Sequence, residues 1–277
     1  MSTIISIVTP TLNAMKYLGE CIESVERQKS ARGSIEHIIV DGGSTDGTVE
    51  LARAHGLRVL QGKDKGIFDA INKGSFAATG ELIGFLGADD KLLDGALEEI
   101  LKCYDKHPNA AWISGGVRLI DAEGKDLGET AAPPGWLTAS IHSCLGWCCI
   151  HHMATYITQD FFAELGGFDL EYSVSGDYEM FCRARSLKPF ARIGKAIACN
   201  RRTGANFSMV HRDIADQQCL AVRETYGPKS GSQRFLNRMI MKGWVYGLNP
   251  GWAARKYVSA GRFPFGVVQG RLRARKA

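Results

Sequence analysis

The chain has 277 residues, of which 45% are hydrophobic and 23% are charged, with 32 Gly and 8 Pro. This composition is typical of a globular protein with a large core, and it excludes disordered, fibrous and coiled-coil proteins. The net charge of +5 is unevenly distributed, because residues 229–277 contain eleven Lys or Arg and no Asp or Glu, which leaves residues 1–228 with −6. The acidic segment 1–228 is compatible with a metal-dependent active site, whereas the basic segment 229–277 is compatible with binding to anionic lipid or nucleic acid.

The eight cysteines form neither a Cys-x-x-Cys pair nor a disulfide framework. A zinc ribbon and a disulfide-stapled fold are therefore excluded. The first residues lack the basic region and the long apolar stretch of a signal peptide. We expect a reduced, cytoplasmic protein.

Strands and helices are predicted to alternate in the first 110 residues. Four short apolar runs predict buried strands at Ile4–Thr9, Glu36–Val40, Leu57–Leu60 and Leu82–Leu86. The helices between and after them are expected from Asn13 through Val25, over 48–55 with Gly56 as the C-terminal cap, over Ile67–Ala78, and around Leu97–Tyr104 with Asp94 as the N-terminal cap. This alternation predicts a doubly wound, mostly parallel, Rossmann-like sheet with helices on both faces.

The second half is less regular. We expect strands at Ala111–Leu119 and Phe190–Cys199, and helices at Tyr178–Ser186 and Asp213–Tyr226. Residues 130–159 contain no Asp, Glu, Lys or Arg. A transmembrane helix is nevertheless excluded there, because two prolines and three histidines interrupt the apolar character.

Polar residues follow each of the first four predicted strands. In a parallel sheet, ligands bind beyond the carboxyl ends of the strands, so these residues are expected at one edge. The sequence contains neither a Gly-x-Gly-x-x-Gly dinucleotide motif nor a phosphate-binding P-loop. Carboxylates at strand ends instead suit hydrogen bonding to a nucleoside and binding of a divalent cation against phosphates.

Several segments together resemble family 2 of the inverting glycosyltransferases. They are Ile7-Val-Thr-Pro-Thr-Leu-Asn13, Val40-Asp-Gly-Gly-Ser-Thr-Asp-Gly-Thr48, Asp64-Lys-Gly-Ile-Phe-Asp-Ala-Ile-Asn-Lys-Gly74, Gly80-Glu-Leu-Ile-Gly-Phe-Leu-Gly-Ala-Asp-Asp90, Gly167-Phe-Asp169 and Gly176-Asp-Tyr-Glu179. The resemblance covers roughly residues 4–226 and is strongest to bacterial members that build surface polysaccharides. It implies a GT-A fold with a nucleotide-sugar-binding half (1–110), an acceptor-binding half (111–228) and a basic, partly helical C-terminal segment (229–277).

The resemblance also implies which residues bind the nucleotide-sugar. They are Thr9, Pro10, Thr11, Asn13, Asp41, Gly43, Ser44, Asp64, Lys65, Gly66, Asn72, Ala88 and Asp89. Asp41 would accept a hydrogen bond from the base, although it could merely fix an Asx-turn after its strand. Asp69 and Asn72 would face the donor sugar, although ordinary solvation of a helix explains them nearly as well.

The family's metal-binding triplet, Asp-x-Asp, aligns with Gly87-Ala88-Asp89, so its first acid is missing here. Asp89 is expected to bind Mn²⁺ or Mg²⁺, which would assist departure of the nucleotide. Asp90 is a weaker candidate, and either carboxylate could instead cap the next helix. His211 is a further candidate metal ligand, against the alternative of a surface histidine.

Inversion requires a base on the face of the sugar opposite the leaving group. The resemblance places that base at Asp177, which could also cap its helix, and Glu179 is the alternative carboxylate. His151 and His152 match no zinc-finger spacing. We expect them on a buried strand that lines the acceptor cleft, with one of them near the acceptor hydroxyls.

We therefore expect a metal-assisted inverting glycosyltransferase that moves a sugar, most simply from a UDP-sugar, to a hydroxyl of a lipid-linked glycan in cell-envelope polysaccharide synthesis. Residues 229–277 are expected to hold it peripherally on an anionic membrane surface at the inner face of the cytoplasmic membrane, and a merely solvated basic end is the alternative. Nucleic acid is not an expected partner. Two rival functions stay open: a sugar-nucleotide-binding module without catalysis, and a docking protein that uses the basic segment.

Overall fold

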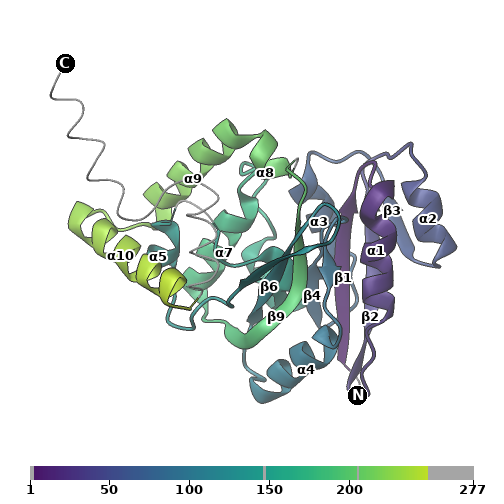
Figure 1. The fold of residues 1–277 in the computed structure, drawn as a ribbon, viewed down its shortest axis with the longest axis horizontal. Coiled ribbons are helices and arrows are strands. Elements are labelled where there is room, and N and C mark those ends of the chain that lie inside the picture. The colour runs from purple at the N-terminus through teal and green to yellow at the C-terminus, as the bar shows by residue number, and fades with distance from the viewer. Residues whose placement is uncertain (1–2, 146–147, 205, 249–277) are drawn as a thin grey trace.

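The computed structural model describes residues 3–145, 148–204 and 206–248. They form a single nine-stranded sheet with helices packed on both faces (Figure 1). The strand order is β3-β2-β1-β4-β8-β6-β9-β5, and β7 pairs with β6 outside this path. The predicted doubly wound architecture is confirmed.

The N-terminal half has the predicted alternation. Its strands β1 (Thr3–Thr11), β2 (Gly33–Asp41), β3 (Arg58–Gln61) and β4 (Leu82–Phe85) are parallel to one another, and the helices are α1 (Met15–Glu26), α2 (Thr48–Ala54), α3 (Ile67–Phe76) and α4 (Ala96–Lys106). Thr11 pairs in register with Asp41 at the ends of β1 and β2. The polar residues after these strands therefore meet at one edge of the sheet.

The C-terminal half mixes directions. Two long strands, β6 (Trp112–Asp121) and β9 (Ala191–Arg202), are parallel to each other, and β8 (Thr155–Thr158) lies antiparallel between β4 and β6. The sequence did not predict β8, nor β5 (Lys91–Leu92) and β7 (Asp126–Thr130). β5 has only two residues, β7 is mostly polar and exposed, and β8 has threonine at both ends, so none of them contains a clear apolar run. The remaining elements are α5 (Ala139–Ser143), the 3₁₀ turn η1 (His152–Ala154), α6 (Gln159–Leu165), α7 (Gly176–Leu187), α8 (Phe207–Val210), α9 (Arg212–Tyr226) and α10 (Gly231–Leu248).

Two apolar clusters fill the two faces of the sheet. One contains Leu18 of α1 and Leu97 of α4, and the other contains Phe68 of α3, Phe162 of α6 and Phe181 of α7. A sheet covered on both faces needs apolar side chains on both sides of its central strands. This explains why the buried parts of β1 and β4 are mainly apolar and do not alternate with exposed polar residues.

Some local predictions are confirmed and others are wrong. Gly56 ends its helix with a positive φ of 71°, as expected for a glycine cap. Asp94 does not cap α4, because the cap position is Gly95 and no side chain caps the helix. The predicted strand at the histidine pair is also wrong: His151 precedes η1 and His152 opens it. None of the helices in the described ranges combines the length and the apolar character needed to cross a bilayer.

Candidate active site

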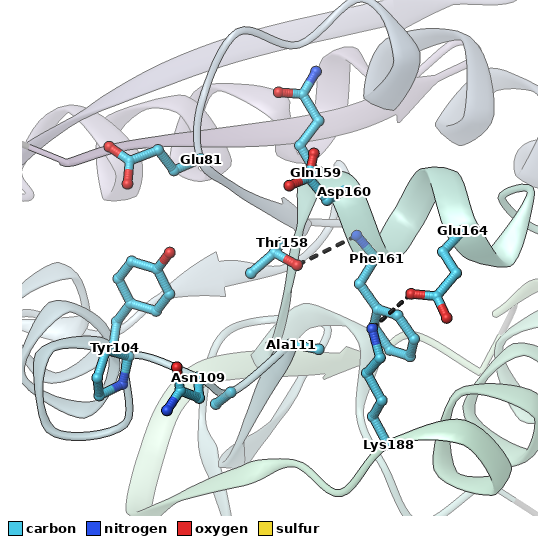
Figure 2. A pocket seen from close by; sticks show the side chains of 12 residues that line it. Glu81, Tyr104, Asn109, Ala111, Thr158, Gln159, Asp160, Phe161, Glu164 and Lys188 are labelled. Atoms are coloured by element: carbon cyan, nitrogen blue, oxygen red, sulfur yellow. Dashed lines mark hydrogen bonds and ion pairs between the residues drawn. The ribbon is translucent and has the colours of Figure 1, made fainter.

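The two ends of the sheet differ in what they offer a ligand. A cavity of about 530 Å³ lies at the amino end of β4, beside Glu81, Tyr104 and Asp160 (Figure 2). The carboxyl end of β4 leads instead to the loop with Asp89, next to the ends of β1 and β2. Because ligands of parallel sheets bind at carboxyl ends, we take the second region as the candidate active site.

The loops after β1 and β2 are joined by hydrogen bonds. Asn13, which has a positive φ of 50°, accepts a bond from the Thr45 N–H at 3.0 Å through its side chain. Its own N–H donates to the Ser44 hydroxyl at 2.8 Å. Asn13 tolerates this left-handed backbone better than most residues. The two loops thus form one continuous rim.

Each carboxylate oxygen of Asp41 already accepts two hydrogen bonds from residues of this rim. It accepts hydrogen bonds from the N–H groups of Gly43 and Ser44 at 3.0 and 2.9 Å, and from the Thr11 and Ser44 hydroxyls at 3.0 and 2.5 Å. Burial opposes its charge, but these donors hold the pKa of Asp41 below its usual value. The Asx-turn, the alternative role of Asp41, is therefore present. A nucleotide base could hydrogen-bond to Asp41 only by replacing one of these donors, such as the Ser44 hydroxyl.

Thr9 does not reach the rim. Its side chain is fully buried, and its hydroxyl lies 2.9 Å from Nε2 of His37 on the neighbouring strand. The expected nucleotide contact is corrected accordingly: Thr9 supports β1 from within. Pro10 is half-buried in the same strand, whereas Gly43 is exposed on the loop.

A lysine of α3 is bound by two carboxylates, one in the preceding loop and one in the first turn of the helix. Lys73 Nζ donates to Asp64 at 2.6 Å and lies 2.9 Å from an oxygen of Asp69, which also accepts from the Lys65 N–H. Asp64 lies against Gly42, with one oxygen 3.1 Å from where a Cβ would lie. The expected positions Asp64, Lys65 and Gly66 are thus brought to the rim.

Asn72 is committed to the backbone and does not face a sugar. Its amide accepts from the Phe168 N–H and donates to the Phe168 carbonyl, both at 2.8 Å. A Cβ on Gly167 would lie 2.6 Å from the same amide oxygen, so this approach needs glycine. The expected donor contact is corrected: Asn72 ties α3 to the turn that precedes the base segment.

The metal triplet lies in the loop after β4. A Cβ on Gly87 would lie 3.0 Å from a carboxylate oxygen of Asp89 and 2.9 Å from one of Asp90, so position 87 faces both acids. Ala88, which lies between Gly87 and Asp89 in the sequence, is half-buried. Burial raises the pKa of Asp89, which indicates a carboxylate with too few donors around it. Neither acid caps α4, so that alternative is excluded.

Asp90 has a structural role. It is buried and accepts hydrogen bonds from the Arg201 N–H at 2.9 Å and from the Asn200 amide at 3.3 Å. Burial, followed by the charge of Asp89, raises the pKa of Asp90. Because its oxygens hold β9, we leave it out of the metal-binding set.

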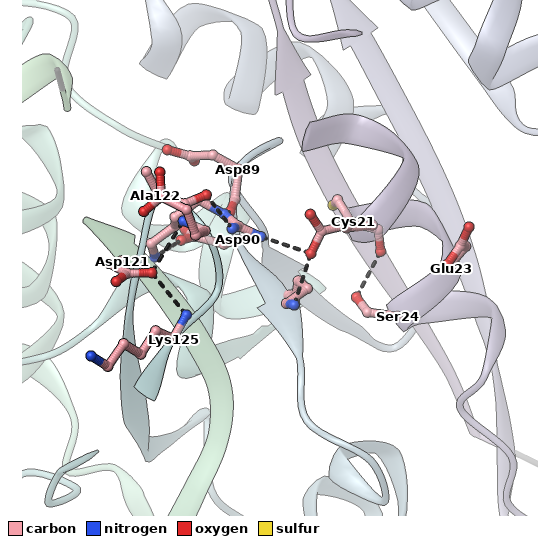
Figure 3. A network of polar contacts seen from close by, with 12 residues as sticks. Cys21, Glu23, Ser24, Asp89, Asp90, Asp121, Ala122 and Lys125 are labelled. Carbon is pink, nitrogen blue, oxygen red and sulfur yellow. Dashed lines mark hydrogen bonds and ion pairs between the residues drawn. The ribbon is translucent and has the colours of Figure 1, made fainter. Parts of the chain in front are cut away.

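Figure 3 shows the loop after β4 with Asp89 and Asp90, called the metal loop below, beside the turn that carries Asp121 and Ala122. The residue that joins the two is Arg201, which was not predicted from the sequence. This guanidinium is 1% exposed and donates to the backbone carbonyls of Asp89 at 2.9 Å and Ala122 at 3.0 Å. It also pairs with Glu20 at 2.9 Å and lies over the Tyr17 ring. The only available signal was a charge at the end of an apolar strand, which predicts a buried role only once its partners are known.

Asp177 lies in the first turn of α7, and its side chain is 25% exposed. Its Oδ1 accepts from the Tyr178 N–H at 2.8 Å, and its Oδ2 lies 3.7 Å from Nδ1 of His152. The cap position is Ser175, so the expected capping role is wrong. Although burial opposes the imidazolium, the hydrogen bond and charge of Asp177, followed by the charges of Asp90 and Asp89, raise the pKa of His152. His152 thus couples the base candidate to the metal loop electrostatically.

Comparison with known proteins decides the family. Residues 6–145 match the model of glycosyl transferase family 2. The chain belongs to this family. It is 30% identical over 188 residues to a PGL/p-HBAD biosynthesis glycosyltransferase of Mycobacterium tuberculosis, covering 65% of this chain and 69% of that protein. It is also 29% identical over 216 residues to the chondroitin synthase of Escherichia coli, covering 76% of this chain and 31% of that protein.

Solved structures show that this glycosyltransferase has the GT-A fold. The S. aureus TarS fragment 1–349 in complex with UDP superimposes with a TM-score of 0.60 at 17% identity, covering 89% of this chain and 72% of that chain. The mannosyltransferase PcManGT from Pyrobaculum calidifontis, in complex with GDP-Man and Mn²⁺, gives 0.60 at 16% identity, covering 99% and 80%. At these identities the likeness concerns the fold alone.

Three other sequence-predicted residues of the glycosyltransferase lie elsewhere. Glu179 is buried in an ion pair with Arg183 at 2.8 Å and accepts from the Tyr226 hydroxyl, so it is no alternative base. His151 bonds to Thr130, and burial lowers its pKa to about 4. His211 lies between α8 and α9 with its ring 4.5 Å from that of Phe207. Within the described residues, no three His, Cys, Asp or Glu side chains form a ready-made metal cluster.

Proposed function

We propose that this chain is an inverting glycosyltransferase that moves a sugar from a UDP-sugar to a hydroxyl of a lipid-linked glycan in cell-envelope polysaccharide synthesis. Membership of family 2 supports the transferase class. The mycobacterial relative is named for PGL/p-HBAD biosynthesis, and the TarS fragment was solved in complex with UDP. Both names are compatible with this donor and acceptor.

The observation that carries the proposal is the grouping of Asp89, His152 and Asp177. They come from the loop after β4, from η1 and from α7, so three separate segments supply one site. The 3.7 Å approach of His152 to Asp177 and the effect of Asp89 on the pKa of His152 support a site in which a candidate base and a candidate cation-binding carboxylate share one histidine neighbour. This is the arrangement that one displacement with a diphosphate leaving group requires.

Asp177 acts as the general base. Its Oδ2, which lies 3.7 Å from His152, accepts the proton of the acceptor hydroxyl as the hydroxyl oxygen attacks the anomeric carbon. The bond to the nucleoside diphosphate breaks on the opposite face, so the product has the inverted anomeric configuration. The partial exposure of Asp177 leaves room for the acceptor, and the Tyr178 N–H and His152 hold the carboxylate in one orientation.

The residues fit a divalent cation held by Asp89. A carboxylate whose pKa is raised by burial gains from a nearby cation, and Mg²⁺ or Mn²⁺ is often bound by one or two carboxylates together with substrate phosphates. When bound, the cation would neutralise charge on the leaving diphosphate. Arg201 holds the Asp89 backbone in place for this role. His211 is not brought to Asp89 by any contact in the described ranges, so it is a weaker ligand candidate.

The nucleotide would bind along the rim of the β1 and β2 loops. The exposed groups there are the side chain of Asn13, the backbone at Gly43, and Lys65 with Gly66 before α3. Asp41 would contact the base only if the Ser44 hydroxyl turned away from it, since its four donors are all internal. Ser44 is therefore the residue whose rotation would open the base site.

The test is donor turnover with stereochemistry. Purified enzyme is incubated with UDP-sugars, Mn²⁺ and extracted lipid-linked glycan, UDP release is measured, and the anomeric proton of the product is read by NMR. Asp177→Asn is expected to lower kcat by about 10²–10⁴-fold, the range for loss of a general base. Asp94→Asn, which removes a carboxylate that is 88% exposed, is the matched control.

Two results would overturn the proposal. Retained turnover in Asp177→Asn would exclude this base. UDP-dependent stabilisation of the wild type without turnover of any UDP-sugar would favour the rival function, a sugar-nucleotide-binding module.

A further inference from the structure

Helix α10, in the basic C-terminal segment, carries an apolar face that the other described residues leave exposed. Helix α10 packs on α5 through Asn237 and Met241, which are 3% and 0% exposed. Asn237 donates to the Ser140 carbonyl at 3.3 Å, and Arg238 donates to the Cys144 carbonyl at 3.0 Å. This side of the helix is therefore fixed to the protein by specific contacts.

The other side of α10 is apolar and open. Phe235, Leu236, Met239 and Ile240 are 67%, 51%, 49% and 40% exposed. At 3.6 residues per turn, these four side chains occupy an arc of roughly 140°. Single exposed apolar residues are ordinary, but four neighbours on one helix face mark an interaction surface.

The charges around this face have one sign. Arg234, Arg238 and Lys242 are the charged residues of α10, and no Asp or Glu occurs anywhere from residue 225 to the end of the chain. Among the described residues, neither Arg234 nor Lys242 forms an ion pair. Lys242 projects beside Phe235, since the two positions are about 20° apart around the helix. Lys242 therefore lies at the edge of the apolar face, whereas Arg234 lies about 100° from Phe235, toward the packed side. An exposed apolar face with a cation at its edge, on a helix that has no acid, is complementary to an anionic lipid surface.

We infer that α10 is a membrane-docking helix, in which Phe235, Leu236, Met239 and Ile240 insert at the headgroup boundary of an anionic bilayer while Lys242 contacts lipid phosphates and Arg234 adds positive charge at a greater distance. Figure 1 shows α10 at the end of the molecule opposite α2 and β3. When α10 is docked, the loops expected to bind the nucleotide therefore lie away from the bilayer.

The docking face is linked to the base helix through α5. His142 of α5 accepts a hydrogen bond at its carbonyl from the Tyr178 hydroxyl at 3.2 Å, and Tyr178 directly follows Asp177. The inference deepens the proposed function, because it brings the acceptor half to the surface from which a lipid-linked acceptor is presented. It does not depend on catalysis, since bilayer binding is measured without donor or acceptor.

The experiment is vesicle flotation of the full chain. Vesicles of phosphatidylglycerol with phosphatidylcholine are compared with vesicles of phosphatidylcholine alone. The double variant Phe235→Gln with Met239→Gln is expected to reduce partition to the anionic vesicles by about tenfold or more. Each lost apolar side chain lowers the partition coefficient by more than about threefold, and the two losses multiply. Arg234→Gln with Lys242→Gln is expected to reduce it and to weaken its dependence on salt.

Leu187→Gln with Leu220→Gln is the matched control, because these leucines are 56% and 49% exposed on α7 and α9. This control is expected to float like the wild type, and circular dichroism with thermal melting checks that every variant is folded. Equal flotation of the Phe235 and Met239 double variant would overturn the inference, because the basic end alone would then bind lipid. Loss of self-association in that variant, without loss of flotation, would assign the face to a second copy of the chain.

Discussion

Nδ1 of His152 lies 3.7 Å from Oδ2 of Asp177, and this contact joins the turn before β8 to the first turn of α7. The second carboxylate oxygen of Asp177 is held by the Tyr178 N–H at 2.8 Å. The imidazole is itself under the influence of both acids of the metal loop, which raise its pKa together with Asp177. We therefore propose that His152 is a positioning residue. It orients the candidate base Asp177, and its pKa depends on the charges of Asp89 and Asp90.

His152→Gln is expected to lower kcat by up to about 10²-fold, because a small misplacement of the base is sufficient for a loss of that size. The KM for the donor is expected to stay within about twofold, since His152 contacts no predicted donor residue. The pH profile of kcat should also lose the contribution of a histidine whose pKa is raised above its ordinary value by Asp177. His151→Gln is the control, because that ring bonds to Thr130. An equal loss in both variants would indicate a purely structural effect.

The two acids of the metal loop are expected to respond oppositely to substitution. Asp89→Asn should abolish the Mn²⁺-dependent part of the thermal shift caused by UDP, and it should leave the free energy of unfolding unchanged or slightly higher, because it removes a charge that burial disfavours. Asp90→Ala should lower the free energy of unfolding by about 1–3 kcal/mol, because it leaves the buried Arg201 N–H without its acceptor. Thermal melting with and without UDP and Mn²⁺ measures both. Retained metal dependence in Asp89→Asn would contradict the assignment.

Asn72→Ala is expected to affect stability more than donor binding. The substitution leaves the N–H and carbonyl of Phe168 without partners, which should lower the free energy of unfolding by about 1–3 kcal/mol. Urea denaturation measures this loss, and Asn109→Ala, at an exposed position, is the control. A normal free energy of unfolding with a strongly raised donor KM would restore the expected contact between Asn72 and the sugar.

The elements of the N-terminal half were predictable because each one contains its own signal. The strand at β1 is a β-branched apolar run, and Gly56 ends α2 at a position where only a left-handed backbone fits well. The strands of the C-terminal half lack such signals. β8 is four residues long and becomes a strand only because β4 and β6 lie on either side of it.

The candidate site was predictable by residue type but not by partner. The carboxylates at the ends of β2 and β4 were identified in the sequence, and the structure brings them to one edge. The sequence could not show that Asp41 is occupied by four internal donors, or that Asn72 reaches a backbone 96 residues away. These contacts depend on tertiary packing, as does the role of Arg201, which joins α1, the β4 loop and the β6 turn.

The buried histidines should make the protein less stable in acid. Burial lowers the pKa of His142 to about 3 and that of His37 to about 4, while the unfolded value is near 6.5. Their folded pKa values lie below the unfolded one, so their contribution to stability is complete above pH 6.5 and is lost as pH falls toward 4. By linkage, each should cost about 2 kcal/mol of unfolding free energy between pH 7 and pH 5. His152, with a raised pKa, acts in the opposite sense and offsets part of this loss.

Urea midpoints measured from pH 7 to pH 5 test the prediction. His142→Gln should flatten the pH dependence by about 2 kcal/mol, whereas His107→Gln, at an exposed position, should leave it unchanged. An unaltered slope in His142→Gln would mean that the imidazole takes up its proton without unfolding, for example by moving toward Asp177, the one charge that raises its pKa.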